Sequence, residues 1–153
     1  QSVVDDTALT NLSTSQDERL MLPTDILVTS NKSGKGSNEM KPLGDVADNQ
    51  LIVDIGSQTA EDFAETIVGA ELVIWNGPMG LAEVPAFAAG TEQTARAVAA
   101  AKYSIIGGGD TIAAADRLGL LPQYDFVSTG GGAMLAFLAG EKLPGLESLG
   151  YYQ

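Results

Sequence analysis

Short apolar runs alternate with amphipathic stretches along most of this chain. Each run is short enough for a strand that is buried on both faces. The runs lie at residues 25–29, 51–54, 71–75, 104–106 and 126–128. Because strands that alternate with helices usually form a parallel sheet covered on both sides, the pattern predicts an α/β fold with about five mostly parallel strands.

Amphipathic stretches between these runs predict four helices. Thr59 and Thr91 stand where the first two of these helices begin, and we predict that each is the N-cap. The first helix then carries an apolar stripe, and the second runs to about residue 101. The last two helices are predicted at residues 111–118 and 133–139, and each ends at a glycine suited to a helix C-terminus, Gly119 or Gly140.

Two segments lack this periodicity. Residues 1–21 are polar and acidic, and we predict a poorly ordered or helical arm that precedes an α/β domain at 22–153. Residues 30–49 are rich in Ser, Asn, Gly and Lys, which indicates a long loop or an exposed hairpin. Residues 32–36 resemble a phosphate-binding P-loop, but Gly36 stands where the motif needs Ser or Thr, so we predict a solvated loop.

Composition excludes several kinds of chemistry. The chain has 153 residues and a net charge of −12, with no cysteine and no histidine. Disulfides, the usual zinc sites, thiol nucleophiles and histidine acid–base catalysis are therefore excluded. The acidic charge should repel nucleic acid and anionic membranes, and no apolar stretch approaches the ~20 residues that span a bilayer. With no signal peptide evident, we expect a cytoplasmic protein that binds neither nucleic acid nor membrane.

Two glycine-rich turns follow the last two apolar runs. Gly107, Gly108 and Gly109 precede Asp110 and Thr111, and a second triplet occupies residues 130–132. If a helix begins at each turn, its free N–H groups and positive dipole end suit a phosphate. Asp110 could then hold Mg²⁺, and Thr111 could donate to a phosphate oxygen. The alternative is a tight strand-to-helix turn in which Asp110 is an ordinary N-cap.

A third candidate segment, residues 74–83, begins within the apolar run at 71–75 and continues beyond it. Asn76 could hydrogen-bond a phosphate and Glu83 could accept hydrogen bonds from ribose hydroxyls, although the segment could equally be a plain loop. Trp75 is expected in the core rather than at a ligand. An acidic chain should repel a nucleotide, so either a metal ion bridges the charges or the basic half of the site lies outside this chain.

In combination, these three segments closely resemble phosphoglycerate kinase. That family carries a WNGPMG…E loop, a GGGDT turn and an STGGGA turn in this order and at these spacings. Shorter stretches of resemblance are LPTD at 22–25, DIG at 54–56 and EKLPG at 141–145. The resemblance covers roughly residues 22–149, and the ordered set of motifs is far more specific than any one of them.

The resemblance implies a Rossmann-like, three-layer nucleotide lobe. In the family, this lobe binds MgADP or MgATP, and a second lobe binds 3-phosphoglycerate or 1,3-bisphosphoglycerate for reversible phosphoryl transfer in glycolysis. The intact enzyme would be monomeric. By resemblance, the nucleotide contacts would be Asn76 at phosphate, Pro78 at adenine, Glu83 at ribose, Asp110 at Mg²⁺ and Thr111 at phosphate, with Gly107, Gly108 and Gly109. The catalytic backbone amides would include those of Gly108, Gly109, Gly131 and Gly132.

The family's substrate lobe and the first part of its nucleotide lobe have no counterpart in this sequence. We therefore expect a portion of the enzyme that is inactive alone, with local departures at Ser57, Gln58, Ala82 and Met134. Two alternatives remain open: a stand-alone nucleotide- or phosphate-binding module that has lost the chemistry, and half of a split enzyme. A portion should expose an apolar sheet face and edge, through which it would associate.

Overall fold

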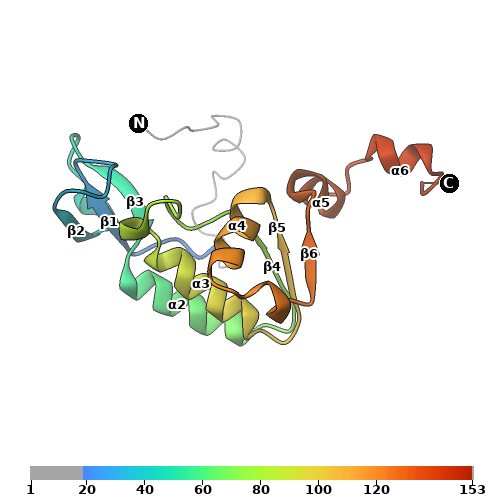
Figure 1. Ribbon diagram of the computed structural model, residues 1–153, viewed down its shortest axis with the longest axis horizontal. Coiled ribbons are helices and arrows are strands. Elements are labelled where there is room, and N and C mark those ends of the chain that lie inside the picture. Colours follow the sequence, from blue (N-terminus) through green and yellow to red (C-terminus); the bar gives the residue numbers. More distant parts are fainter. Residues whose placement is uncertain (1–18, 153) are drawn as a thin grey trace.

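The computed structural model describes residues 19–152 and has the predicted α/β fold (Figure 1). The expectation for residues 1–21 therefore lies almost entirely outside the described part. The strands are β1 (Asp25–Thr29), β2 (Asn38–Pro42), β3 (Leu51–Ile55), β4 (Val73–Asn76), β5 (Ser104–Gly107) and β6 (Phe126–Ser128). The helices are α2 (Ser57–Val68), α3 (Ala89–Ala99), α4 (Gly109–Arg117), α5 (Gly131–Leu138) and α6 (Pro144–Ser148). Short 3₁₀ turns occur at η1 (Leu43–Asp45), η2 (Pro85–Phe87) and η3 (Leu121–Gln123).

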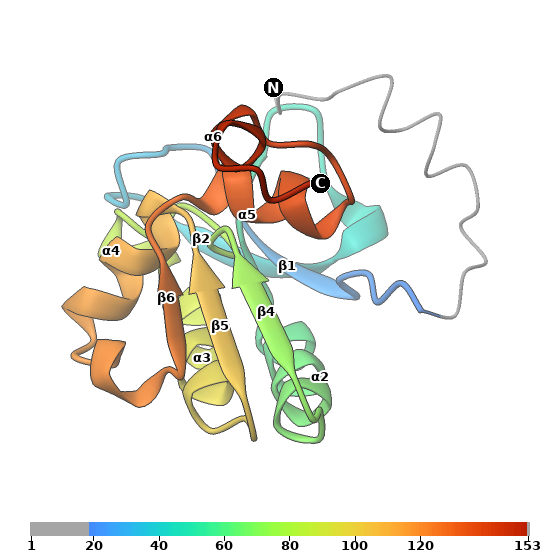
Figure 2. The ribbon, with the colours of Figure 1, turned by 90° about the vertical axis from the view of Figure 1, so that its right-hand side faces the viewer.

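The second half of the chain forms a parallel sheet of three strands in the order β4-β5-β6. One face of this sheet packs against α3 and α4, and its core contains Trp75, Val98 and Ile106. Trp75 is only 4% exposed, which confirms its expected place in the core. Figure 2 looks onto the other face, over which no helix lies. Ile74 and Phe126 on that face are 39% and 55% exposed, as expected for an uncovered apolar face.

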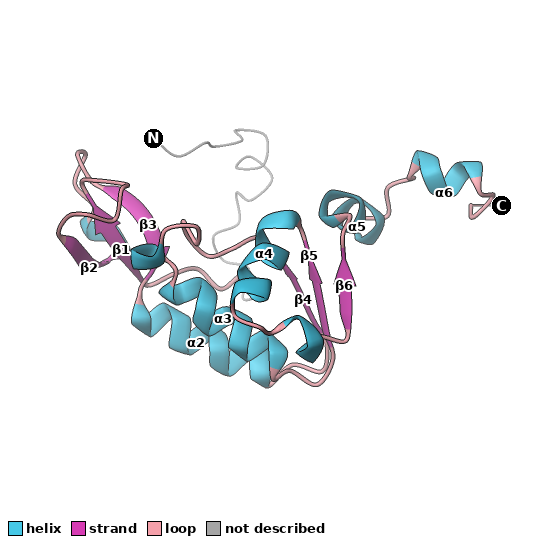
Figure 3. Ribbon diagram, in the orientation of Figure 1, coloured by secondary structure: helices cyan, strands magenta, loops and turns pink. Residues whose placement is uncertain are grey.

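The prediction of mostly parallel strands is wrong for the first half of the chain. There, a separate three-stranded sheet has the order β2-β1-β3, and β1 is antiparallel to both neighbours (Figure 3). Parallel neighbours need a crossover of a dozen or more residues, usually a helix, and residues 30–50 contain the strand β2 and the turn η1 but no α-helix. The chain instead turns back as an exposed hairpin, which was one of the two expectations for this segment.

The predicted N-caps are also wrong, whereas the predicted helix ends are confirmed. Gly56 occupies the N-cap position of α2 and Ala88 that of α3, while Thr59 and Thr91 lie at the third helical position and are buried. Gly119 follows the C-cap of α4 with a φ of 68°, the left-handed conformation in which glycine commonly ends a helix. The same conformation ends α5 one residue after its C-cap.

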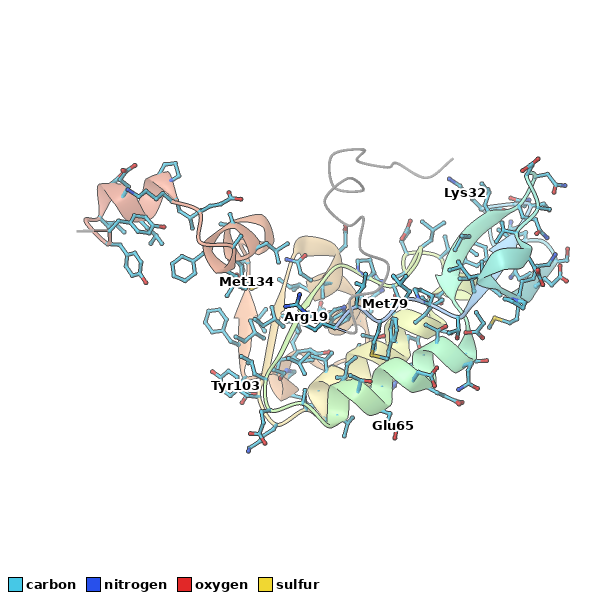
Figure 4. The ribbon with its side chains drawn as sticks, turned by 180° about the vertical axis from the view of Figure 1, so that it is seen from behind. Arg19, Lys32, Glu65, Met79, Tyr103 and Met134 are labelled. Carbon is cyan, nitrogen blue, oxygen red and sulfur yellow. The ribbon has the colours of Figure 1, made fainter. Side chains whose placement is uncertain are left out.

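Residues 32–36 form a largely exposed loop. Lys32 lies in the exposed loop between β1 and β2, on the opposite side of the molecule from Met134 of α5 (Figure 4). This agrees with a solvated loop rather than a P-loop.

None of the helices within residues 19–152 is long and apolar enough to span a membrane.

Candidate nucleotide site

The carboxyl ends of the parallel strands bring the three candidate segments together. Asn76, Gly107 and Ser128 occupy equivalent positions across β4, β5 and β6. Each candidate segment continues from one of these strand ends. In parallel sheets this edge is where ligands bind, because the loops that leave adjacent strands converge there.

The two glycine turns are in direct contact with each other. A Cβ atom at Gly131 would lie 2.4 Å from the backbone nitrogen of Gly108 and 2.5 Å from its Cα, so no side chain fits there. Gly108 has a φ of 92°, a conformation that favours glycine. Asn76 completes the cluster, because its Nδ2 donates a hydrogen bond to the Gly131 carbonyl oxygen at 3.1 Å.

Met134 further restricts this junction. A Cβ atom at Gly107 would lie 2.6 Å from Cε of Met134, whose side chain reaches back from α5 toward the strand ends (Figure 4). Close packing against backbone therefore requires glycine at Gly131, and the positive φ favours it at Gly108, whatever ligand the turns bind. At Gly107 a side chain would displace only the flexible end of Met134. This is a structural reason for glycine that the sequence pattern alone does not reveal.

Helices α4 and α5 begin at these turns, with Gly109 and Gly131 as their first residues. The first N–H groups of a helix have no partner within it, and the aligned peptide dipoles place partial positive charge at that end. Gly109, Asp110 and Gly132 are exposed, so the entrance to both helices is accessible. Such an edge can bind an anion without any basic side chain.

A pocket of about 370 Å³ opens beside the N-terminus of α4. Its lining includes Pro78, Glu83 and Asp110, three residues for which the resemblance implies contacts with different parts of a nucleotide. Arg117 also lines it and donates a hydrogen bond from Nη2 to the Ala82 carbonyl oxygen at 3.0 Å. A smaller hollow of about 220 Å³ adjoins it, and both share Ala82, Glu83 and Arg117.

Sequence reasoning missed Arg117, although the helical spacing could have indicated it. Residues 110, 113 and 117 recur at i, i+3 and i+7 and therefore share one face of α4. That face forms one wall of the pocket, and the 78–83 segment forms the other. No glycine of either triplet lines this pocket, and neither Asn76 nor Thr111 does. Gly131 lies instead against Gly108 and Asn76.

The hydroxyl of Thr111 already has a structural partner. The side chain is fully buried, and its Oγ1 accepts a hydrogen bond from the backbone N–H of Gly77 at 2.7 Å. This bond attaches the start of the 77–83 loop to α4. Its role at a phosphate stays a prediction.

Asp110 is the acidic residue in the first turn of α4, and its side chain is exposed. Across residues 19–152, no cluster of three or more acidic side chains is arranged to hold a metal ion. Mg²⁺ commonly takes one or two protein carboxylates and completes its shell with phosphates and water. A single carboxylate at a helix N-terminus fits a magnesium ion that arrives with its nucleotide.

Comparisons with known proteins identify one family. A family model described as phosphoglycerate kinase matches residues 3–141. The chain is similar to the structure of phosphoglycerate kinase from Coxiella burnetii, at 39% identity and a TM-score of 0.81, over 89% of this chain and 36% of that one. It is also similar to the crystal structure of phosphoglycerate kinase from Pyrococcus horikoshii OT3, at 38% identity and a TM-score of 0.71. That match covers 83% of this chain and 31% of the other. The chain thus spans about a third of the length of these structures.

Proposed function

The chain belongs to the phosphoglycerate kinase family, and we propose that it supplies one wall of the nucleotide cleft of such a kinase. The observation that carries this proposal is the pocket that Pro78, Glu83 and Asp110 line together at the carboxyl edge of the parallel sheet. The intact enzyme would transfer a phosphoryl group between 1,3-bisphosphoglycerate and MgADP, giving 3-phosphoglycerate and MgATP. Glycolysis would place it in the cytoplasm.

Each lining group suits one part of MgADP or MgATP. Pro78 offers an apolar surface to the adenine, and the Glu83 carboxylate can accept hydrogen bonds from ribose hydroxyls. Asp110 can bind the Mg²⁺ that neutralises the phosphates. The free N–H groups at the start of α4, beside Asp110, can stabilise the negative charge of the transferring group.

Phosphoryl transfer needs positioning and charge neutralisation more than covalent chemistry. A chain without cysteine or histidine can therefore contribute to it. The acid substrate would bind to a part of the family's fold that this chain does not span. We therefore propose that the chain alone binds MgADP but does not turn over.

Titration of the purified chain with MgADP tests the binding half of this proposal. The single tryptophan, Trp75, directly precedes Asn76, so its fluorescence should report ligand at the strand ends. We expect saturable binding by fluorescence and by calorimetry. Asp110→Asn should weaken binding about tenfold and Glu83→Gln by a similar factor, because each loses about one charge-assisted hydrogen bond or metal contact.

Glu65→Gln is the matched control, because Glu65 is an exposed acid on α2, away from the pocket (Figure 4). It removes the same charge and should bind MgADP as the unchanged chain does. Absence of saturation at millimolar MgADP would contradict binding by this chain.

A coupled assay for phosphoryl transfer tests the catalytic half. We expect no turnover by the chain alone, and measurable turnover when a polypeptide with the remaining part of a family member is added. Turnover by the chain alone would overturn our proposal of inactivity. MgADP binding without turnover in the mixture would instead favour the non-catalytic binding module.

A further inference from the structure

A buried carboxylate lies beneath the pocket-lining loop. Asp54, near the end of β3, is 1% exposed. Its Oδ2 accepts a hydrogen bond from the backbone N–H of Gly90 at 2.8 Å, and its Oδ1 accepts one from the N–H of Ile55 at 2.9 Å. A buried carboxylate is costly unless its oxygens are paired, so these bonds tightly constrain the groups that make them.

The bond to Gly90 places the carboxylate at the start of a helix. Gly90 is the second residue of α3, where the backbone N–H has no partner within the helix. Asp54 therefore supplies a cap from a strand that is 36 residues away in sequence. A Cβ atom at Gly90 would lie 2.5 Å from Oδ1 of Asp54, so the helix begins directly against the carboxylate.

The pocket-lining loop rests on the same residue. A Cβ atom at Gly80 would lie 2.4 Å from the Val53 carbonyl oxygen and 2.8 Å from Oδ1 of Asp54. The N–H of Leu81 donates to the same Val53 carbonyl at 2.9 Å. Gly80 and Leu81 lie between Pro78 and Glu83, so the middle of the pocket wall is pressed onto β3.

A second bond ties this loop to α3. The N–H of Met79 donates to Oγ1 of Thr91 at 3.1 Å, and Thr91 directly follows the Gly90 that Asp54 holds. The carboxylate thus contacts the loop itself at Gly80 and, through the first turn of α3, holds a second point of it at Met79. Asp54 does not itself line the pocket.

We propose that Asp54 is a positioning residue for the nucleotide pocket: it fixes the first turn of α3 and the Gly80 turn together, and so holds Pro78 and Glu83 opposite Asp110. This inference rests on the proposed function for the ligand, but the mechanical link between Asp54 and residues 78–83 is independent of it. Loss of the carboxylate should loosen the pocket wall before it loosens the rest of the fold.

Asp54→Asn tests this inference, with Asp25→Asn as the matched control. Asp25 also caps a helix from a distant strand, because it accepts hydrogen bonds from the N–H groups of Gln58 and Thr59 in α2, but it lies outside the pocket. Hydrogen exchange without ligand is the first measurement. We expect exchange across residues 78–83 and at Gly90 to rise about tenfold or more in Asp54→Asn, since a buried N–H loses its acceptor.

In Asp25→Asn, faster exchange should be confined to the start of α2, and exchange at residues 78–83 should be unchanged. MgADP affinity is the second measurement, and we expect it to fall about tenfold in Asp54→Asn and to stay constant in Asp25→Asn. A uniform rise in exchange over the whole chain, or unchanged exchange at residues 78–83, would overturn the inference.

Gly80→Ala keeps the carboxylate and pushes the loop away from β3, so it provides a second test if Asp54→Asn does not fold. We expect the same local rise in exchange at residues 78–83, and its absence would contradict the proposed link. If the unchanged chain binds no MgADP, the proposed function fails while the exchange measurements still decide the role of Asp54.

Discussion

The Asp25 carboxylate at the start of β1 caps α2 through Thr59: its Oδ1 lies 2.8 Å from the Thr59 backbone nitrogen and 2.6 Å from the Thr59 hydroxyl. In return, Thr59 Oγ1 accepts hydrogen bonds from the backbone N–H groups of Thr24 and Asp25. Asp54 makes the equivalent connection to α3. The antiparallel sheet therefore supplies carboxylates to the first turns of both helices, which joins the sheet and the helices into one unit.

Loss of the Thr59 hydroxyl should destabilise the fold. In Thr59→Val the shape is retained, but the N–H groups of Thr24 and Asp25 lose their acceptor. We expect the free energy of unfolding to fall by about 1–3 kcal/mol, measured by urea denaturation. Thr66→Val in the exposed part of α2 is the control and should change it by less than about 0.5 kcal/mol. If Thr59→Val and Thr66→Val change the free energy of unfolding equally, the hydrogen bonds of the Thr59 hydroxyl contribute little to stability.

Asp25 should also contribute to the pH dependence of stability. Burial acts to raise its pKa, but hydrogen bonds from the Thr59 hydroxyl and from the N–H groups of Thr59 and Gln58 outweigh this, so the pKa lies below its usual 3.8. A carboxyl group whose pKa is lowered by folding stabilises the fold above its unfolded pKa, and this is lost as the pH falls through the folded pKa.

The stability difference between the unchanged chain and Asp25→Asn should therefore be constant above about pH 5 and shrink as the pH falls below about 4. Urea denaturation of both proteins across this range gives the difference directly. Burial raises the pKa of Asp54 against opposing hydrogen bonds from Gly90 and Ile55, but Asp54 is present in both proteins and cancels. A difference that grows on acidification would contradict a lowered pKa for Asp25.

The contact between the glycine turns predicts opposite effects for two adjacent glycines. A Cβ atom at Gly131 would overlap Gly108, so Gly131→Ala should destabilise the fold by about 1–3 kcal/mol. At Gly132, in the first turn of α5, no atom lies within 4 Å of such a Cβ atom. Gly132→Ala should therefore be neutral or stabilise by about 0.4–1 kcal/mol, since it restricts the unfolded chain. Thermal unfolding of the two variants side by side checks this order, and a reversed order would refute the close packing at Gly131.

Two isoleucines on opposite faces of the parallel sheet test where the core lies. Ile106 is 0% exposed beneath α3 and α4, and Ile106→Ala should cost about 2–5 kcal/mol. Ile74 is 39% exposed on the uncovered face, and Ile74→Ala should cost less than half as much in dilute solution. If chains associate through this face, as the sequence predicts, the cost at Ile74 should increase with protein concentration. Urea denaturation at two protein concentrations separates the intrinsic cost of Ile74→Ala from the effect of association. Comparable costs of Ile74→Ala and Ile106→Ala in dilute solution would mean that the face around Ile74 is already covered.

Much of the fold could be predicted because local sequence records burial and backbone conformation. All five apolar runs became strands, although β6 is only partly buried. Gly119 and Gly140 end their helices, because only the local left-handed conformation is required there. The ordered motifs around Asn76, Asp110 and Gly131 indicated the family for the same reason, since they are contiguous stretches of chain.

Tertiary structure alone decided which groups meet across the chain. Thr59 looked like an N-cap because its residue type and position fit one, but its hydroxyl is bound to β1 and a carboxylate 34 residues away caps α2. The sequence did not show that β1 would be antiparallel to its neighbours, because strand direction depends on how residues 30–50 return. Nor did it show that Arg117 lines the pocket or that Asp54 supports it. These relationships depend on distances between segments, which no local pattern records, and they become definite only when the two sheets and the helices pack together.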